Sequence, residues 1–251
     1  MEKQNLIDQW KREEQQPFRG WDFSYLDGRY FEPAPPWSYE ERARRLLRES
    51  DSVLDMGTGG GEKLLEFIDD LPENSVATEG WPPNVPVARQ NLEPHGIRVV
   101  PYNAEEDRRM PFPDGSFSLI INRHEAYDAG EVARVLKQGG AFLTQQVTGP
   151  DLSPVFGPRP VPEVTLAACR GALEQAGFSI GYADEAMGRL GFADVGAFVY
   201  YARAAPWDAP SDFSVERYAD RLLEMHENRK LSFKMGHFII QARMKQGAYS
   251  A

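Results

Sequence analysis

The chain has 251 residues, 41% hydrophobic and 26% charged, and its 28 basic residues face 38 acidic ones for a formal net charge of −10. This composition is typical of a globular protein, and the single cysteine, Cys169, excludes an intrachain disulfide framework. No apolar run approaches the roughly 20 residues of a membrane helix, and no signal peptide is apparent, so we expect a cytoplasmic protein without membrane contact.

The first 48 residues are predicted to lie outside the main sheet. Residues 1–16 have the spacing of an amphipathic helix, and residues 17–37 form a loop-like stretch dense in aromatic side chains. The segment from Ser38 to Glu41 has the form of a capping box, so a helix should begin at Ser38. We interpret residues 1–48 as an N-terminal helical and aromatic lid segment.

From residue 52 onward, short apolar segments alternate with helical patterns. Such alternation predicts an α/β fold with a mostly parallel sheet and helices on both faces. The predicted strands cover residues 52–56, 75–78, 96–102, 117–122, 141–147, 178–186 and 232–244, and the predicted helices residues 62–70, 84–92, 131–137, 164–176, 192–203 and 214–228.

The glycine loop after the first of these strands is the most informative stretch. Gly57, Gly59 and Gly61 allow a tight turn against which a ligand can press. A dinucleotide-binding loop would need glycine at the position of Glu62, whose carboxylate would repel a pyrophosphate. The loop therefore suits a cofactor without phosphates, and Asp55 is placed to bind an ammonium group of that cofactor.

Two further polar positions follow the next two strands. Glu79 ends the second strand, where a carboxylate can bind both hydroxyls of a ribose. Asn103, Ala104 and Glu105 end the third strand and are candidates to contact the edge of an adenine.

The order of these motifs resembles class I S-adenosylmethionine-dependent methyltransferases, and closely the methyltransferase type 11 group. The sequence departs from the family at Asn103, where aspartate is more frequent, and at Gln138, where proline is usual. The resemblance covers about residues 50–147 and rests on five segments: Asp55 to Gly61, Glu79, Tyr102 to Glu105, Met110 to Phe117 and Ala133 to Gly140.

The resemblance implies a single domain over residues 1–251 with a Rossmann-like, seven-stranded, mostly parallel sheet whose last strand is antiparallel. Residues 49–150 would be the cofactor-binding core, and residues 151–251 the C-terminal part of the sheet and the substrate side. S-adenosylmethionine would be the cofactor and S-adenosylhomocysteine the product. The implied cofactor-binding residues are Asp55, Gly57, Thr58, Gly59, Gly61, Glu79, Gly80, Asn103, Ala104, Glu105 and Asn122.

Methyl transfer is an in-line displacement, so positioning and the exclusion of water should supply most of the catalysis. His124 and Glu125 are the candidates for a base, although His124 could instead pack beneath the cofactor. The N-terminal aromatic side chains would form the lid or, alternatively, a hydrophobic cluster under a long loop. The expected substrate-binding residues are Trp21, Tyr25, Tyr30, Trp37, Tyr39, Arg123 and Gln145.

The leading functional hypothesis is methyl transfer to a small-molecule acceptor. An RNA or protein acceptor is the alternative, but residues 51–150 carry 16 acidic and 8 basic side chains, which weighs against nucleic acid. A third hypothesis is a cofactor-binding module without transfer activity, which Asn103 keeps open. The histidines lack metal-ligand spacing, so no metal is expected. Neither the acceptor nor the oligomeric state follows from the sequence.

Overall fold

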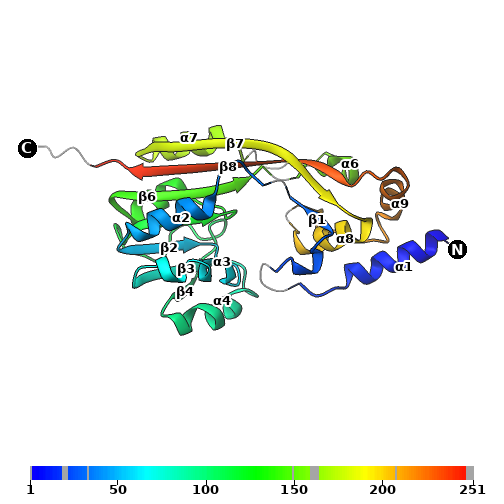
Figure 1. The fold of residues 1–251 in the computed structure, drawn as a ribbon, viewed down its shortest axis with the longest axis horizontal. Helices are drawn as coiled ribbons and strands as arrows, with labels where there is room; N and C mark the ends of the chain where they lie inside the picture. The colour runs from blue at the N-terminus through cyan, green and yellow to red at the C-terminus, as the bar shows by residue number, and fades with distance from the viewer. Residues whose placement is uncertain are drawn as a thin grey trace, which may run out of the picture.

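The computed structural model describes residues 2–18, 22–32, 34–148, 150–158, 164–206 and 208–246. The described strands form one mixed sheet of eight strands (Figure 1). In sheet order they are β1 (Tyr30–Phe31), β7 (Phe178–Phe192), β8 (Ser232–Met244), β6 (Leu136–Val147), β5 (Phe117–Arg123), β2 (Ser52–Met56), β3 (Asn74–Glu79) and β4 (Arg98–Pro101).

Strands β4, β3, β2, β5 and β6 are mutually parallel, whereas β8 runs antiparallel to both β6 and β7. The predicted α/β fold is thus confirmed, and the last strand is antiparallel. The expected count of seven strands is wrong, because Tyr30 and Phe31 of the N-terminal segment pair with the far end of β7 and add an eighth strand.

Helices cover both faces of the sheet. The helix expected to start at Ser38 does so, because the Ser38 side chain accepts a hydrogen bond from the Glu41 backbone N–H. The described helices are α1 (Glu2–Glu14), α2 (Tyr39–Arg48), α3 (Glu62–Leu65), α4 (Val85–Leu92), α5 (Ala129–Val135), α6 (Ser153–Phe156), α7 (Leu166–Gln175), α8 (Val195–Ala204) and α9 (Ala219–Asn228), with 3₁₀ turns η1 (Ser24–Leu26), η2 (Ile68–Asp70) and η3 (Glu93–His95).

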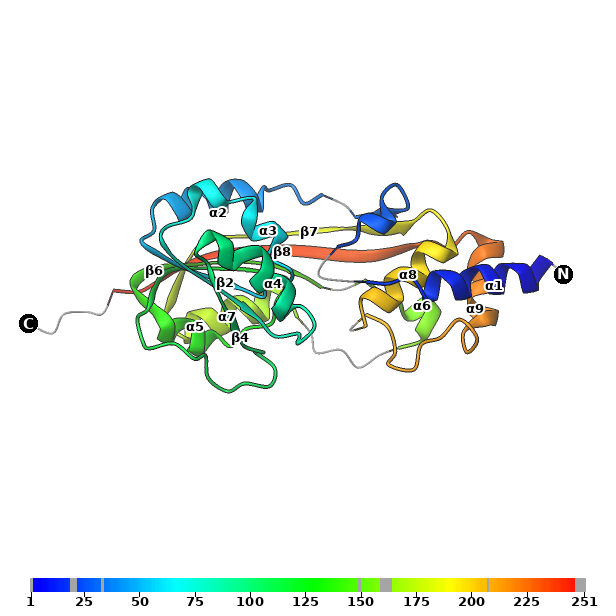
Figure 2. The same ribbon diagram turned by 90° about the horizontal axis from the view of Figure 1, so that it is seen from below.

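Strand alternation divides the buried side chains of the sheet between two apolar clusters. Val53 packs in the cluster that includes Leu47 of α2, whereas its neighbour Leu54 packs in the cluster that includes Val132 of α5 and Leu173 of α7. Figure 2 shows α2 on one side of the sheet and α5 and α7 on the other. We call β2 to β6 with α2 to α5 and α7 the parallel core.

Strands β7 and β8 extend beyond the parallel core and carry a second group of elements (Figure 1). This helical lobe consists of α1, η1, β1, α6, α8, α9 and the adjoining ends of β7 and β8. Its apolar cluster brings together Trp10 of α1, Phe198 of α8 and Leu222 of α9. The lid expectation is therefore not confirmed for α1, which packs against α8 inside this lobe. In the described part of the chain, no helix has the length and apolar character of a membrane span.

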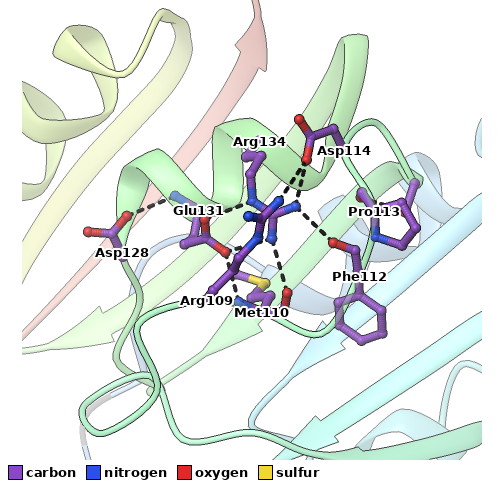
Figure 3. Close-up of polar contacts among 9 residues, drawn as sticks. Arg109, Met110, Phe112, Pro113, Asp114, Asp128, Glu131 and Arg134 are labelled. Atoms are coloured by element: carbon purple, nitrogen blue, oxygen red, sulfur yellow. Dashed lines mark hydrogen bonds and ion pairs between the residues drawn. The ribbon is translucent and has the colours of Figure 1, made fainter.

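A polar network fastens the loop between β4 and β5 to α5 (Figure 3). The Arg134 guanidinium donates to the backbone carbonyls of Met110 at 3.0 Å and Phe112 at 2.8 Å. It also bonds to the carboxylates of Glu131 at 2.7 Å and Asp114 at 2.8 Å. One side chain thus fixes the loop that follows Asn103 and Glu105.

We expect Arg134→Met to lower the free energy of unfolding by about 2–3 kcal/mol, because two carbonyls and two carboxylates lose a charged donor. Urea denaturation measures this change. Arg109→Met is the matched control, since the Arg109 side chain is 69% exposed and reaches Asp114 only at 3.5 Å, and it should change stability by less than about 0.5 kcal/mol. Equal stabilities of the two variants would contradict a structural role for the network.

Candidate functional site

A cleft of about 1740 Å³ lies between the parallel core and the helical lobe. One wall consists of the loops at the carboxyl ends of β2, β3, β4 and β5, and the other of the N-terminal segment, α8 and the residues after α8. Pockets for single ligands typically measure about 300–1,000 Å³. The cleft therefore has room for two ligands side by side.

Most residues expected to bind the cofactor meet along one wall of this cleft. Gly61, Ala104 and Asn122 do not line it. The eight that do are Asp55, Gly57, Thr58, Gly59, Glu79, Gly80, Asn103 and Glu105.

Of the three residues that do not line the cleft, Gly61 and Asn122 are buried and have structural roles. A Cβ on Gly61 would lie 2.7 Å from Leu92 Cγ, so this glycine permits the close approach of α3 and α4. Asn122 is fully buried, and its Nδ2 donates to the carbonyl of Glu125 at 3.1 Å. Its Oδ1 accepts hydrogen bonds from Thr144 and Gln146. Through these hydrogen bonds Asn122 fixes the position of the segment after β5.

The glycine loop and the end of β3 are shaped by close contacts. Gly57 has φ of 69°, and a Cβ there would lie 2.5 Å from Glu125 Cβ, so only glycine fits. The carboxylate of Glu79 accepts a hydrogen bond from the Trp81 backbone N–H at 2.7 Å. Trp81 itself lines the cleft and is 48% exposed, and the sequence analysis missed it. Its position two residues after Glu79 could have indicated that Trp81 lies at the same site.

Burial and mutual repulsion raise the pKa values of three acidic groups on this wall. Burial, with a contribution from the charge of Glu79, raises the pKa of Asp55 to about 7. Burial together with the charges of Glu79, Glu105 and Asp55 raises the pKa of Glu125 to about 7. The pKa of Glu79 is also raised, chiefly by burial. A cation bound among these carboxylates would favour their ionised forms.

His124 lines the cleft with its backbone in the left-handed region, at φ of 64°. Burial, followed by the charge of Arg123, lowers the pKa of His124 to about 4, so the ring is neutral at neutral pH. Trp37 Nε1 donates to Gln145 Oε1 at 2.8 Å, and Gln145 Nε2 lies 3.5 Å from His124 Nε2. Because indole and amide N–H groups only donate, we assign Nε2 of His124 as the acceptor nitrogen.

Some of the expected substrate-binding residues line the cleft, and others do not. Tyr30, Tyr39 and Arg123 line the cleft. Trp37 and Gln145 do not, because the buried indole N–H requires a partner and finds it in Gln145 behind His124.

Two other members of that set lie elsewhere. Tyr25 is 42% exposed, packs on Tyr200 with ring centroids 4.6 Å apart and is not part of the cleft wall. Trp21 lies outside the described residues.

On the side of the helical lobe, the expected Tyr30 is joined by Glu32, Tyr201 and Asp208, three polar cleft residues that could not be identified from the sequence. The Tyr30 hydroxyl donates to Glu32 Oε2 at 2.8 Å, and His237 Nε2 lies 2.6 Å from Glu32 Oε1. The Tyr201 hydroxyl donates to Asp208 at 2.6 Å. Glu32 and His237 are 205 positions apart in the chain, so no local pattern linked them. Within the described ranges, no group of three or more metal-ligating side chains is found.

Comparisons with known proteins match the part of the chain that forms the parallel-core wall of the cleft. Residues 54–144, from β2 into β6, match the methyltransferase domain family. The uncharacterized methyltransferase YcgJ of Bacillus subtilis is 34% identical over an alignment of 103 residues, and the match covers 38% of this chain and 40% of YcgJ. The match thus spans less than half the length of that relative.

Solved structures share the fold over more of the chain. The crystal structure of YcgJ covers 82% of this chain and 98% of its own, with 21% identity and a TM-score of 0.56. A putative methyltransferase from Bacillus halodurans covers 83% and 100%, with 19% identity and a TM-score of 0.54. The [4+2]-cyclase SpnF covers 87% of both chains, with 18% identity and a TM-score of 0.53. At these identities the likeness concerns the fold alone.

Proposed function

We propose that the chain is a class I S-adenosylmethionine-dependent methyltransferase, which its match to the methyltransferase domain family supports, and that it transfers a methyl group from S-adenosylmethionine to a small-molecule acceptor bound in the cleft. The observation that carries the proposal is the convergence of Asp55, Glu79, Asn103 and the glycine loop on one wall of a cleft with room for a second ligand.

The donor set of this wall fits the cofactor. Asp55 provides a carboxylate for an ammonium group, and Glu79 provides one for ribose hydroxyls. Glu62 also lines the cleft at the start of α3, where it would repel phosphate groups. When bound, S-adenosylmethionine supplies an electrophilic methyl group on a positively charged sulfur. The chain then has to orient the acceptor and keep water away.

The charge of the cleft supports a small acceptor that is not an anion. Its described lining holds eleven carboxylate side chains but only three lysine or arginine side chains, Lys63, Arg123 and Arg203. Such a surface repels phosphate and therefore RNA. Phe18, Phe23 and Tyr30 offer apolar contact on the side of the helical lobe, which favours an organic molecule.

Two measurements test the proposal. In calorimetry we expect binding of S-adenosylmethionine and S-adenosylhomocysteine but not of NAD. With a methyl-labelled donor and a cell extract, we expect label in the small-molecule fraction. Label in RNA or protein would contradict the acceptor class, and cofactor binding without any transfer would favour a binding module. Absence of cofactor binding would refute the proposal.

The affinity for S-adenosylmethionine should rise from about pH 6 to about pH 8. Asp55 and Glu125 have pKa values raised to about 7, so both are mostly protonated below that pH. A cation binds the ionised carboxylates, and each group that must lose its proton costs up to about tenfold in affinity per pH unit below its pKa. Calorimetry across this range checks the slope, and Glu125→Gln should make it shallower. A pH-independent affinity would exclude these carboxylates from cofactor binding.

A further inference from the structure

The helical-lobe wall of the cleft presents one carboxylate held by two neighbours. Glu32 follows β1 and lines the cleft. Oε2 of its carboxylate accepts from the Tyr30 hydroxyl at 2.8 Å, and Oε1 lies 2.6 Å from His237 Nε2. The His237 side chain is 4% exposed, whereas that of Glu32 is 32% exposed. The imidazole thus lies behind the carboxylate, and the carboxylate is the accessible member of the pair.

These contacts keep Glu32 ionised. Burial alone would raise the pKa of this carboxyl, but the hydrogen bonds from His237 and Tyr30 lower it below its usual value. An ionised carboxylate only accepts hydrogen bonds, so we assign the proton of His237 to Nε2. Each oxygen of Glu32 has one donor, which leaves further lone pairs for a ligand.

No described lysine or arginine forms an ion pair with Glu32, which pairs with His237 instead. Two of the three described cationic side chains that line the cleft already have acidic partners: Arg123 pairs with Glu40, and Lys63 pairs with Glu66. The two hydrogen-bond donors stabilise the anion, and its accessible lone pairs carry a negative charge that a positively charged ligand group would complement. The ligand that complements Glu32 is therefore cationic.

Aromatic rings surround this carboxylate. The Tyr30 ring stacks against Tyr201, with centroids 5.7 Å apart and an interplanar angle of 21°. Phe23 lies on Tyr30 at 6.4 Å and 17°. All three line the cleft, and aromatic rings attract organic cations as well as apolar groups. His124, whose ring centroid lies 6.2 Å from that of His237, connects this wall to the segment after β5.

We propose that Glu32 binds the protonated amine of the methyl acceptor, so that the acceptor is an amine with an apolar or aromatic body. This inference rests on the proposed function. The ammonium nitrogen first loses one proton to water, because the Glu32 carboxylate, which His237 and Tyr30 keep ionised, is too weak a base to hold that proton. Its freed lone pair then forms the N–C bond while the electrons of the S–C bond stay on sulfur, which yields the N-methylated ammonium and S-adenosylhomocysteine.

Matched probes test the acceptor class by binding alone. Phenethylamine, phenethyl alcohol and phenylacetate share one skeleton and differ only in the terminal group. Each is titrated into the full chain saturated with S-adenosylhomocysteine. We expect phenethylamine to bind at least about tenfold tighter than the alcohol, and phenylacetate not to bind. Glu32→Gln should remove the preference for the amine and leave the affinity for S-adenosylhomocysteine unchanged.

Glu106→Gln is the matched control, because Glu106 is an exposed carboxylate on the same cleft and its substitution removes the same charge. It should keep the preference for the amine. Tyr30→Phe is the second variant in case Glu32→Gln does not fold, and it should weaken the preference several-fold because Glu32 loses one of its two donors.

The inference is overturned if wild-type protein binds the alcohol as well as the amine or binds neither. It is also overturned if the preference survives in Glu32→Gln, or if Glu106→Gln loses it equally. These outcomes are distinct from failure of the proposed function, which would appear as absence of S-adenosylhomocysteine binding to the wild-type chain.

Discussion

Gly59→Val is expected to weaken the binding of S-adenosylhomocysteine by at least about a hundredfold. Gly59 lines the cleft within the loop between β2 and α3, and its φ is 62°. A β-branched residue in this left-handed conformation is strained, and its side chain would enter the space where a ligand approaches the backbone. Calorimetry with S-adenosylhomocysteine measures the loss.

Gly96→Val separates loss of the site from loss of the fold. Gly96 follows η3 with φ of 79°, a Cβ there meets open space, and the residue does not line the cleft. Each variant should lose about 1–2 kcal/mol of stability from backbone strain, but only Gly59→Val should lose the ligand. Normal affinity in Gly59→Val would mean that the loop has only a structural role, and the cofactor assignment would fail.

The wall that we propose binds the cofactor, called here the cofactor wall, could be predicted as one group of residues, because each of its motifs is local in the sequence. Asp55, the glycines, Glu79 and Asn103 each end a strand of the parallel core or follow one directly, and the carboxyl ends of parallel strands meet at one edge. The order of the motifs along the chain therefore fixes their order along the edge. The same reasoning cannot tell which residues within one loop face the ligand. Thr58 lines the cleft, whereas Gly61 packs against Leu92.

The wall that we propose binds the acceptor, called here the acceptor wall, could not be predicted, because it joins segments that are distant in sequence. Glu32 meets His237 only because β1 pairs with the far end of β7, which in turn pairs with β8. This contact depends on how far β7 and β8 extend beyond the parallel core. The alternation of apolar and polar residues along these strands does not indicate where the parallel core ends. Trp37 and Gln145 were misplaced for the same reason, since their hydrogen bond spans 108 positions.

The N-terminal segment was interpreted as a lid, an expectation that is not confirmed for its first helix. The apolar side of α1 was recognised from the sequence, but its partner was not, because α8 lies about 190 positions later in the chain. Trp10 is 2% exposed within the cluster of the helical lobe. Removal of residues 1–37 would therefore expose the core of this lobe rather than merely open the cleft.

Trp10→Ala should destabilise the helical lobe by about 3–5 kcal/mol, the usual cost of removing a buried aromatic side chain. The indole contacts the His226 ring of α9 edge-on, with centroids 6.0 Å apart. We expect faster hydrogen exchange in α8 and α9, while β2, β3 and β5 keep their protection, because their apolar clusters do not include Trp10. The variant should still bind S-adenosylhomocysteine but lose the preference for phenethylamine.

Trp81→Ala is the matched control for stability. This indole is 48% exposed, so its removal should change the free energy of unfolding by less than about 1 kcal/mol. If Trp10→Ala instead accelerates exchange equally throughout the sheet, the two lobes unfold as one cooperative unit. In that case α1 stabilises the whole chain through β7 and β8, which cross both lobes, and the acceptor wall cannot be loosened without also losing the cofactor wall.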